Sequence, residues 1–422
     1  MKIEDLISFV SRLIYYIEEK NTSFDKAFIY TRNYFKTKRP LKLYFYISKD
    51  IVSKYYFLKI ISKEFFGRET RKNIVKTWLI LYGEQYPSLR DASLRLKRKI
   101  ARRGKQVSID NIMCSLPDED KIAFKYSVPP WIVKTLRKYM SIGEIELLLK
   151  SMLKETLWIR VNTLKISLSE AKKYFEENEV VAEQDSDYCF LFKVLKSKKP
   201  IHMLDYVREG KIIIQDKASI VAVDALELSE NDVILDLCAA PGLKTSLIFQ
   251  FLENKCRVVA CDISWQRLKN MKKLLKLYGV DLSKVDLIKM DSRKIPFRKL
   301  IRVTKVLIDA PCSSSGVMLR DPAIRIQLKD SDSIGSYIIV QKGLVQEAVK
   351  HFRGKEIVYA TCSLFPQEGE EIIDAVFSEV KLYPLKVPGN PGYRGFKCSN
   401  YVKRLFPHVH DTNGFFITKF AA

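Results

Sequence analysis

The chain has 422 residues, 47% of them hydrophobic, so it can form two or three domains with buried cores. Its 73 Lys and Arg residues exceed its 49 Asp and Glu residues, and the net charge of +24 favours a polyanionic partner, nucleic acid before a membrane surface. The sequence contains no apolar run of about 18 residues and no signal-peptide pattern, so we expect an intracellular protein without a membrane span.

Residues 1–110 are predicted to form an all-helical domain. Its first apolar stripe has helical spacing and consists of Ile3, Leu6, Ile7, Val10, Leu13, Ile14 and Ile17. Similar stripes follow at 43–66 and 74–81. The region ends in a basic run that holds Arg95, Lys97, Arg98, Lys99, Arg102, Arg103 and Lys105. This run either contacts phosphates or solvates the end of a helix, and the residues alone favour neither function.

Residues 111–217 are predicted to form a small α+β, RRM-like, RNA-binding region. We expect helices at 131–139 and 144–153 and a strand at 157–163, and then a helix starting near 167 and strands at 189–194 and 211–215. Basic side chains are frequent here, namely Arg160, Lys165, Lys193, Lys196, Lys198 and Lys199. They suit contact with an RNA backbone, although ordinary surface charge is the competing interpretation.

Residues 218–422 alternate between apolar runs and helical segments, which indicates an α/β domain with a mostly parallel sheet. The predicted strands are 233–238, 257–261, 285–290, 306–308 and 357–359. Ligands of such sheets bind beyond the carboxyl ends of the strands. The residues that follow these ends include Asp262, Asp291, Asp309, Cys312 and Cys362.

The turn after the first of these strands predicts an adenosine-containing ligand without phosphates. Small residues at 239–242 let a ligand approach the backbone closely, and Asp262 suits a ribose diol. Asp291 is placed to accept from an exocyclic amine. A dinucleotide is the first rival, but the turn lacks G-x-G-x-x-G and is a poor pyrophosphate cradle. S-adenosylmethionine fits better.

Eight cysteines lie at 114, 189, 238, 256, 261, 312, 362 and 398. They form no C-x-x-C pair, and the four histidines have no metal-like spacing, so we expect free thiols and no metal site. Most cysteines of this kind are buried as small apolar residues. Cys312 and Cys362 are exceptions because each follows a predicted strand end.

Three motifs resemble those of the NOL1/NOP2/Sun (RsmB/NOP) family of RNA (cytosine-5) methyltransferases. They lie at 236–245, 309–316 and 360–363, and weaker similarity appears at 160–165, 210, 215–219 and 411–416. The resemblance covers roughly 125–422. The helical region before it is vaguely similar to the NusB-like extension of some members. A Rossmann-like methyltransferase domain is the fold that this resemblance implies.

The resemblance implies a covalent mechanism that needs two cysteines. Carbon 5 of cytosine is a poor nucleophile, so a thiolate must first add at carbon 6. By family analogy Cys362 attacks, and Cys312 assists proton removal and product release. Asp309 would hydrogen-bond the N3/N4 edge of the base. Related DNA enzymes use the cysteine of a Pro-Cys motif, so attack by Cys312 is the competing assignment.

The matched positions also imply a set of binding residues. Asp262 would bind the ribose, Asp291 the adenine, and Asp309 would lie near the transferable methyl group. Arg267 would pack near the adenosine, with an ordinary surface arginine as the alternative. Residues lining the methionine portion would be Cys238, Ala239, Ala240, Pro241, Gly242, Leu243 and Lys244. Lys244, Arg160 and Arg320 are candidates for contact with the substrate.

Leu243 departs from the family pattern, and a cluster of glutamates follows the second cysteine motif. The family usually has a glycine at the position of Leu243, so we expect the turn to be tightened differently or the cofactor to be displaced. Glu368, Glu370 and Glu371 are expected to begin a helix, where carboxylates favour the N-terminal dipole, rather than to take part in catalysis.

We therefore predict an RNA (cytosine-5)-methyltransferase with ribosomal RNA as substrate in preference to transfer RNA. It would be a cytoplasmic monomer, or a nucleolar or nuclear one in a eukaryote. The alternative is a noncatalytic RNA-binding or ribosome-assembly factor built on a methyltransferase fold. The two candidate cysteines, with Asp262, Asp291 and Lys244, favour the enzyme.

Overall fold

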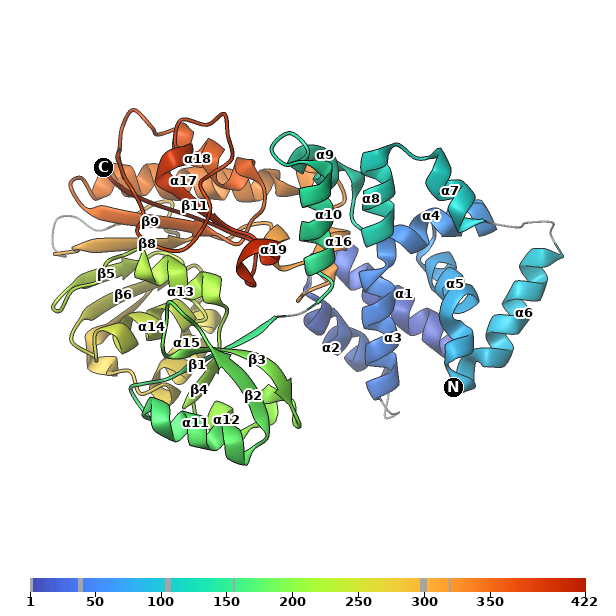
Figure 1. Cartoon of the computed structure of the whole chain (residues 1–422), viewed down its shortest axis with the longest axis horizontal. Helices are drawn as coiled ribbons and strands as arrows, with labels where there is room; N and C mark the ends of the chain where they lie inside the picture. Colours follow the sequence, from blue (N-terminus) through green and yellow to red (C-terminus); the bar gives the residue numbers. More distant parts are fainter. Residues whose placement is uncertain (1–2, 37–40, 103–107, 155, 297–301, 319) are drawn as a thin grey trace. The chain divides into compact units, whose positions relative to one another are not determined.

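A computed structural model describes residues 3–36, 41–102, 108–154, 156–296, 302–318 and 320–422. The chain divides into two compact units (Figure 1). The first, the helical unit, comprises Met1–Leu153 and Met318–Gly335, and the second, the α/β unit, comprises Lys154–Val317 and Ser336–Ala422. The finer division at residues 110 and 217 stays a prediction.

The helical unit contains a long amphipathic first helix. Helix α1 (Ile3–Lys20) buries Leu6, Val10, Leu13, Ile14 and Ile17, as its apolar stripe predicts. The other helices before residue 154 are α2 (Phe24–Phe35), α3 (Leu41–Ser53), α4 (Tyr55–Phe66), α5 (Arg71–Tyr82), α6 (Arg90–Ala101), α7 (Ile109–Ser115), α8 (Asp118–Tyr126), α9 (Pro130–Leu136) and α10 (Ile142–Ser151).

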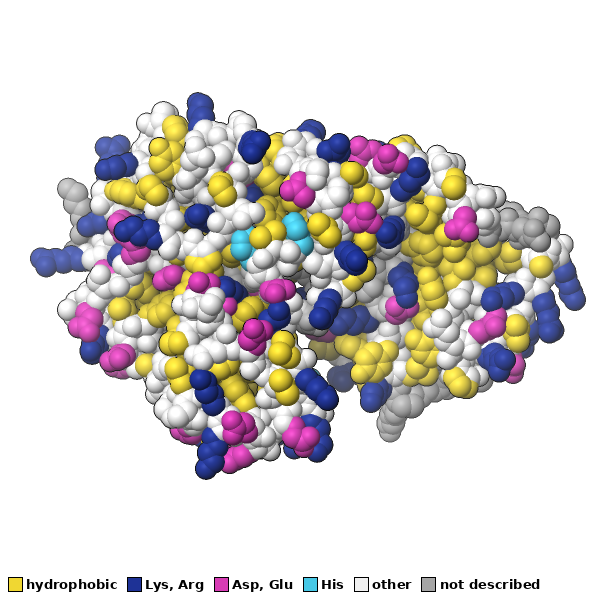
Figure 2. Space-filling view, in the orientation of Figure 1, with side chains coloured by type: hydrophobic (Ala, Val, Ile, Leu, Met, Phe, Trp, Pro, Cys, Tyr) yellow, Lys and Arg dark blue, Asp and Glu magenta, His cyan; other side chains and the backbone are white. Residues whose placement is uncertain are grey.

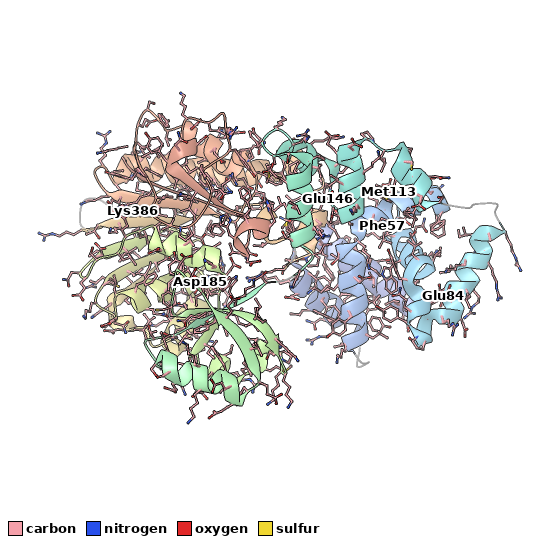
Figure 3. All side chains as sticks on the ribbon, viewed as in Figure 1. Phe57, Glu84, Met113, Glu146, Asp185 and Lys386 are labelled. Carbon is pink, nitrogen blue, oxygen red and sulfur yellow. The ribbon has the colours of Figure 1, made fainter. Side chains whose placement is uncertain are left out.

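The helical unit has a main core and a smaller one. The main core joins α1 to α5 around Trp78, whose Nε1 donates to Asp50 at 2.7 Å. The smaller core joins α4, α5, α6, α7 and α8, and Phe57 and Met113 pack against it (Figure 3). Packing of amphipathic faces therefore stabilises this unit.

The segment 318–335 leaves the α/β unit and packs within the helical unit. It contains helix α16 (Ala323–Gln327), whose Ala323 and Ile326 belong to the main helical core. Arg325 is buried and donates to the carbonyl oxygens of Ser53 at 2.8 Å and Tyr126 at 3.1 Å. The sequence pattern does not predict that residues 318–335 belong to the helical unit.

The α/β unit begins with a small antiparallel sheet in the order β2-β3-β1-β4. Its strands are β1 (Leu157–Val161), β2 (Val180–Gln184), β3 (Leu191–Ser197) and β4 (Ile212–Ile214), with helices α11 (Leu168–Glu177) and α12 (Asp205–Arg208) between them. The β-α-β-β-α-β chain order with β3 between β1 and β2 is a split βαβ arrangement. The sheet contains the three strands predicted for this region and also β2, which was not predicted, while the predicted helices at 131–139 and 144–153 correspond to α9 and α10 of the helical unit.

The second sheet is mostly parallel and has the order β10-β12-β9-β8-β5-β6-β7, with β11 paired to β12. Its strands are β5 (Val233–Asp236), β6 (Arg257–Asp262), β7 (Val285–Lys289), β8 (Lys305–Asp309), β9 (Glu356–Thr361), β10 (Lys381–Tyr383), β11 (Val402–Leu405) and β12 (Phe415–Ala421). Strands β9, β8, β5, β6 and β7 are parallel, and β10, β11 and β12 pair antiparallel. The chain order reverses between β5 and β8, where open α/β sheets bind ligands.

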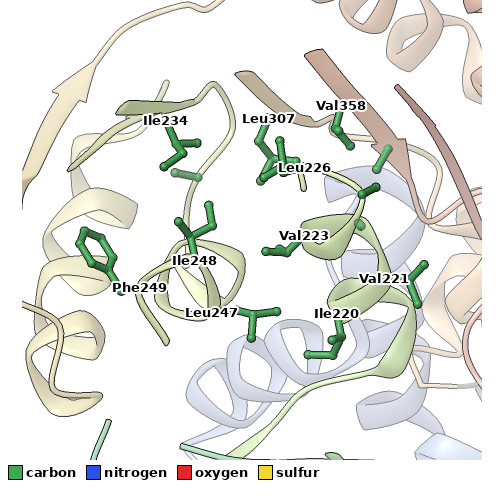
Figure 4. Close-up of a cluster of buried hydrophobic side chains, with 14 of the residues drawn as sticks. Ile220, Val221, Val223, Leu226, Ile234, Leu247, Ile248, Phe249, Leu307 and Val358 are labelled. Atoms are coloured by element: carbon green, nitrogen blue, oxygen red, sulfur yellow. The ribbon is translucent and has the colours of Figure 1, made fainter. Parts of the chain in front are cut away.

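Helices cover both faces of this sheet. On one face α13 (Lys217–Asp224), α14 (Leu243–Phe251) and α15 (Trp265–Leu277) bury alternate residues of the strands, including Ile234, Leu307 and Val358 (Figure 4). On the other face α17 (Gly335–His351) and α18 (Glu370–Asp374) pack on Leu235, Ile308 and Tyr359. Helix α19 (Pro407–His410) precedes β12. Burial on both faces explains the unbroken apolar runs of the central strands.

Within the described ranges, no helix combines the length and the apolar character that a membrane span requires. The same ranges contain no group of three or more His, Cys, Asp or Glu side chains arranged to hold a metal ion.

The basic run at 95–105 is only partly described. Its first part lies on α6, where Arg95, Lys97, Arg98 and Lys99 are exposed, and Figure 2 shows blue side chains over this helix. Lys97 pairs with Glu84 at 2.5 Å. Arg103 and Lys105 lie outside the described residues.

Candidate active site

A pocket of about 520 Å³ lies beyond the carboxyl ends of the parallel strands in the α/β unit. The loops after β5, β6, β7, β8 and β9 contribute to it, as does α17. The predicted residues that line it are Cys238, Ala240, Asp262, Arg267, Asp291, Asp309, Cys312 and Cys362. Parallel strands thus bring together side chains separated by more than a hundred residues.

The turn from β5 into α14 is tightened at Gly242. This residue has φ of +104° and precedes α14, and a Cβ atom there would lie 2.8 Å from Met271 Cγ. Leu243 is the first residue of the helix, where a side chain is tolerated. The left-handed position of the turn is therefore occupied by Gly242, and Leu243 does not have a positive φ. Ala239, Pro241, Gly242, Leu243 and Lys244 form this turn without lining the pocket.

Lys244 and Asp309 form a partly buried ion pair beside the two cysteines. Lys244 Nζ lies 2.6 Å from Asp309 Oδ2. Burial lowers the pKa of Lys244, but the Asp309 carboxylate outweighs burial, and the net direction is upward. Lys244 therefore remains protonated at the start of α14, next to Cys362.

The thiols of Cys312 and Cys362 are in direct contact. Their Sγ atoms lie 3.1 Å apart, and Cys362 Sγ lies 3.5 Å from Ser314 Oγ. The hydrogen bond with Cys312 lowers the pKa of Cys362, and Ser314 and Lys244 act in the same direction, while burial and the Asp309 carboxylate oppose them. The same bond, burial and Glu368 raise the pKa of Cys312. Either sulfur can donate in this contact, and Cys362 is the more acidic of the two thiols.

The two acidic residues after β6 and β7 are each held by an arginine. Asp262 accepts from the Ser264 amide at 2.8 Å and pairs with Arg267 at 2.9 Å, and Arg267 also donates to the carbonyl oxygen of Ala240. Asp291 pairs with Arg293 at 2.6 Å, which lowers the pKa of Asp291. A ligand that uses these carboxylates must share them with the arginines.

Sequence reasoning missed several residues of the pocket. Arg293 lies two positions after Asp291, and this closeness in sequence could have indicated that Arg293 also lines the pocket. Ile263 follows Asp262 and is largely exposed, which leaves an apolar face at the pocket. Val340 and Leu344 come from α17, and nothing in their local sequence links them to the strand ends.

Arg160 and Arg320, two of the predicted substrate residues, are not among the residues that line the pocket. Arg160 on β1 is fully buried and donates to Gln250 at 2.9 Å and to Ser246 at 2.8 Å, both on α14. These bonds join β1 of the small sheet to helix α14, and the burial argues against contact with RNA. Arg320 belongs to the segment 318–335 of the helical unit, and the pocket belongs to the α/β unit.

A comparison with protein families matches this part of the chain. The profile described as 16S rRNA methyltransferase RsmB/F matches residues 223–421. Residues 223–421 are a methyltransferase domain of the RsmB/F family. The RsmB/F domain contains all the residues that line the pocket, and the family predicted from the motifs is confirmed.

Three curated relatives extend the similarity. The 28S rRNA (cytosine-C(5))-methyltransferase of Mus musculus is 30% identical over 315 residues, which are 71% of this chain and 39% of that protein. The Ribosomal RNA small subunit methyltransferase B of Serratia proteamaculans is 29% identical over 70% of this chain and 66% of its own. The tRNA (cytosine(72)-C(5))-methyltransferase of Pyrococcus horikoshii is 38% identical over 50% of this chain and 52% of its own. The chain thus spans between about two fifths and two thirds of the length of these relatives.

Two solved structures are similar to the RsmB/F domain and beyond it. The crystal structure of PH0851 has a TM-score of 0.76 at 25% identity and covers 99% of both chains. The crystal structure of NSun6 from Pyrococcus horikoshii with SFG has a TM-score of 0.61 at 25% identity and covers 68% of this chain and 96% of that chain. The predicted fold class, with its helical region and Rossmann-like domain, is confirmed.

Proposed function

We propose that the protein methylates carbon 5 of cytosine in RNA, with S-adenosylmethionine as methyl donor. The observation that carries this proposal is the contact between Cys312 and Cys362 beside the Lys244–Asp309 pair. Two thiols in contact at the ends of neighbouring parallel strands suit a reaction in which one adds to the base and the other assists its release. The names of the three relatives, all RNA methyltransferases, support the same reaction.

The pocket suits S-adenosylmethionine in size and in its polar groups. Small-molecule pockets typically enclose about 300–1,000 Å³, and this one encloses about 520 Å³. Asp262 would accept from the ribose hydroxyls and Asp291 from the adenine amine, while Cys238 and Ala240 of the turn after β5 would lie against the methionine portion. The cofactor supplies a methyl group on a positively charged sulfur. SFG, bound in the similar NSun6 structure, is an analogue of this cofactor.

Cys362 is the proposed nucleophile. Its thiolate would form a bond to carbon 6 of cytosine, and the electron pair of the C5–C6 double bond would move to carbon 5. Carbon 5 would then take the methyl group as the bond between that methyl group and the donor sulfur breaks, which leaves a neutral thioether. The proton on carbon 5 would then pass to a base or to water, a step that Cys312 assists. The C5–C6 double bond forms again, and the bond between Cys362 and carbon 6 breaks to restore the thiolate. Asp309 would hold the N3/N4 edge of the base through these steps.

Ribosomal RNA is the proposed substrate in preference to transfer RNA. Two relatives are named for ribosomal RNA and one for transfer RNA, and the helical unit before the RsmB/F domain is an additional basic region. We place the enzyme in the cytoplasm, or in the nucleolus or nucleus of a eukaryote, as a monomer without a metal ion.

The test is methyl transfer from labelled S-adenosylmethionine to separated ribosomal and transfer RNA, read out by mass spectrometry of the nucleosides. We expect 5-methylcytidine in the ribosomal fraction and none with Cys362→Ala. Cys189→Ala, which removes an exposed thiol, should behave as wild type. Binding of cofactor and RNA without 5-methylcytidine in either fraction would contradict the proposal and favour a noncatalytic RNA-binding factor.

A second arm of the same experiment assigns the two thiols. Cys312→Ala should accumulate a covalent protein–RNA adduct, because attack by Cys362 persists while release is impaired. A denaturing gel with labelled RNA detects the adduct. Adduct in Cys362→Ala and none in Cys312→Ala would reverse the two roles.

A further inference from the structure

Glu368 is a buried carboxylate that lies between the two cysteine loops. It ends the short 3-10 helix Pro366–Glu368 after β9 and has no exposed surface. Its Oε1 accepts from the Ser313 amide at 2.8 Å and from Gln341 Nε2 at 3.0 Å. Its Oε2 accepts from the hydroxyl of Ser363 at 2.6 Å and from that of Ser313. One side chain therefore binds both loops and α17.

The two serines bound by Glu368 directly follow the two candidate catalytic cysteines. Ser313 comes after Cys312, and Ser363 comes after Cys362. Other bonds join the same loops: the Gly316 amide donates to the Cys362 carbonyl oxygen at 3.0 Å, and the Leu364 amide donates to Ser315 Oγ at 2.9 Å. A shift of the Glu368 carboxylate would therefore move both thiols relative to each other.

Glu368 acts on the acidity of Cys312, whereas Lys244 acts on that of Cys362. Among the described residues no Lys, Arg or His side chain forms an ion pair with it, and its four donors are neutral groups. Lys244 favours a thiolate at Cys362, and Glu368 disfavours one at Cys312. Other titratable groups around the thiols and Glu368 are Asp309, Tyr359, Cys238 and Arg404. Arg404 pairs with Glu370 and donates to the Ser363 carbonyl oxygen at 3.1 Å.

We propose that Glu368 is a positioning residue of the active site, which sets the contact between the two thiols and keeps the shared proton on Cys312, so that Cys362 is the thiolate. Its functional consequence rests on the proposed methyl transfer, but the bias between the thiols does not need RNA or cofactor. Replacement by glutamine keeps the shape of the side chain and removes its charge.

Alkylation of the full chain with iodoacetamide tests the bias directly. The label on Cys312 and Cys362 is quantified by peptide mass spectrometry between pH 6 and 9. In the wild type Cys362 should react first, and in Glu368→Gln the ratio of Cys312 to Cys362 labelling should rise about tenfold, as for a change of about one unit in relative pKa. Glu371→Gln, an exposed glutamate three residues on, is the matched control and should leave the ratio unchanged.

Methyl-transfer kinetics provide the second readout. Glu368→Gln should lower kcat about tenfold or more with KM for RNA nearly unchanged, because the thiols and not the RNA contacts are altered. A wild-type labelling ratio in folded Glu368→Gln would overturn the proposal. If that variant does not fold, Ser313→Ala and Ser363→Ala each remove one bond to the carboxylate, and wild-type ratios and kcat in both would overturn it equally.

The outcomes also separate this inference from the proposed function. A wild type that forms no 5-methylcytidine but shows the expected change in labelling contradicts the methyltransferase activity alone. A wild type that is active, with a Glu368→Gln variant equal to it in labelling and kcat, contradicts the role of Glu368 alone.

Discussion

At the scale of single residues, the environment of each strand end decides the chemistry of its side chain. Cys312 and Cys362 are the same residue type in contact with each other, and yet their pKa values shift in opposite directions. The hydrogen bond between the two thiols is the main cause of both shifts, and Ser314 and Lys244 near Cys362 and Glu368 near Cys312 add to it. Two cysteines that each follow a strand end therefore acquire different acidities from the groups around them.

Asp236 at the end of β5 predicts a pH dependence of stability. Burial raises the pKa of this carboxyl from 3.8 to about 7, although Thr245 donates to it at 2.8 Å. Between these values the folded state holds a proton that the unfolded state has lost, so the contribution of Asp236 to stability is present below pH 3.8 and is lost as pH rises to 7.

Asp236→Asn should remove that loss, because the amide does not titrate. Urea unfolding of wild type and variant between pH 5 and pH 8 measures the effect. We expect the variant to gain on the order of 2 kcal/mol relative to wild type between pH 5 and 7. The exposed Asp332→Asn serves as control, and a constant difference between Asp236→Asn and wild type across the range would contradict the expectation.

At the scale of elements, helix α16 illustrates that a short segment can belong to a core far from its neighbours in sequence. It is only five residues long, and it is held by Arg325 and by two apolar side chains. Asp321 accepts from the Phe24 amide at 3.0 Å, and Gln327 donates to the Thr22 carbonyl oxygen at 3.0 Å. Tertiary bonds, rather than helix propensity, therefore stabilise this element.

Arg325→Ala should destabilise the helical unit by about 3 kcal/mol, since it leaves the carbonyl oxygens of Ser53 and Tyr126 without this buried donor. Burial lowers the pKa of Arg325 only to about 10, so the guanidinium that is lost is charged. Hydrogen exchange measured by mass spectrometry should show faster exchange in α3, α8 and α16 than in wild type. Lys329→Ala, exposed in the same segment, should leave exchange unchanged, and equal behaviour of the two variants would refute the role of Arg325.

At the scale of the whole molecule, the net charge of +24 predicts strong and salt-dependent binding of RNA. Release of counterions from the phosphates should weaken binding by about a thousandfold between 50 and 200 mM salt if several phosphates are contacted. Arg98→Ala/Lys99→Ala on α6 should reduce the slope of log affinity against log salt by about one or more.

The matched control for that variant is Lys381→Ala/Lys386→Ala, which removes two exposed positive charges from the α/β unit; Lys386 is labelled in Figure 3. Fluorescence anisotropy with a labelled RNA fragment measures both slopes. Equal slopes for the two variants would indicate that α6 has no special role and that its charges only solvate the helix.

The sequence by itself determined the five parallel strands, three of the four strands of the small sheet and the identity of the residues at the strand ends, because apolar periodicity and motif spacing are local properties. Asp262, Asp291, Asp309, Cys312 and Cys362 are all at one pocket for this reason. The backbone geometry was needed to show that Gly242 takes the left-handed conformation in the turn and that Leu243 is the first residue of α14.

Only the tertiary structure decided which distant groups meet. Arg160 is positively charged, as RNA-contacting residues often are, but it is buried against α14. The sequence shows the charge and does not show which face of the strand is covered. Glu368 has the position of a helix start, and long-range packing turns it into the shared acceptor of Ser313 and Ser363. The segment 318–335 joins the helical unit through contacts nearly 300 residues apart in sequence. Such contacts depend on how the buried faces of helices and strands pack against each other, and a local sequence pattern does not contain that information.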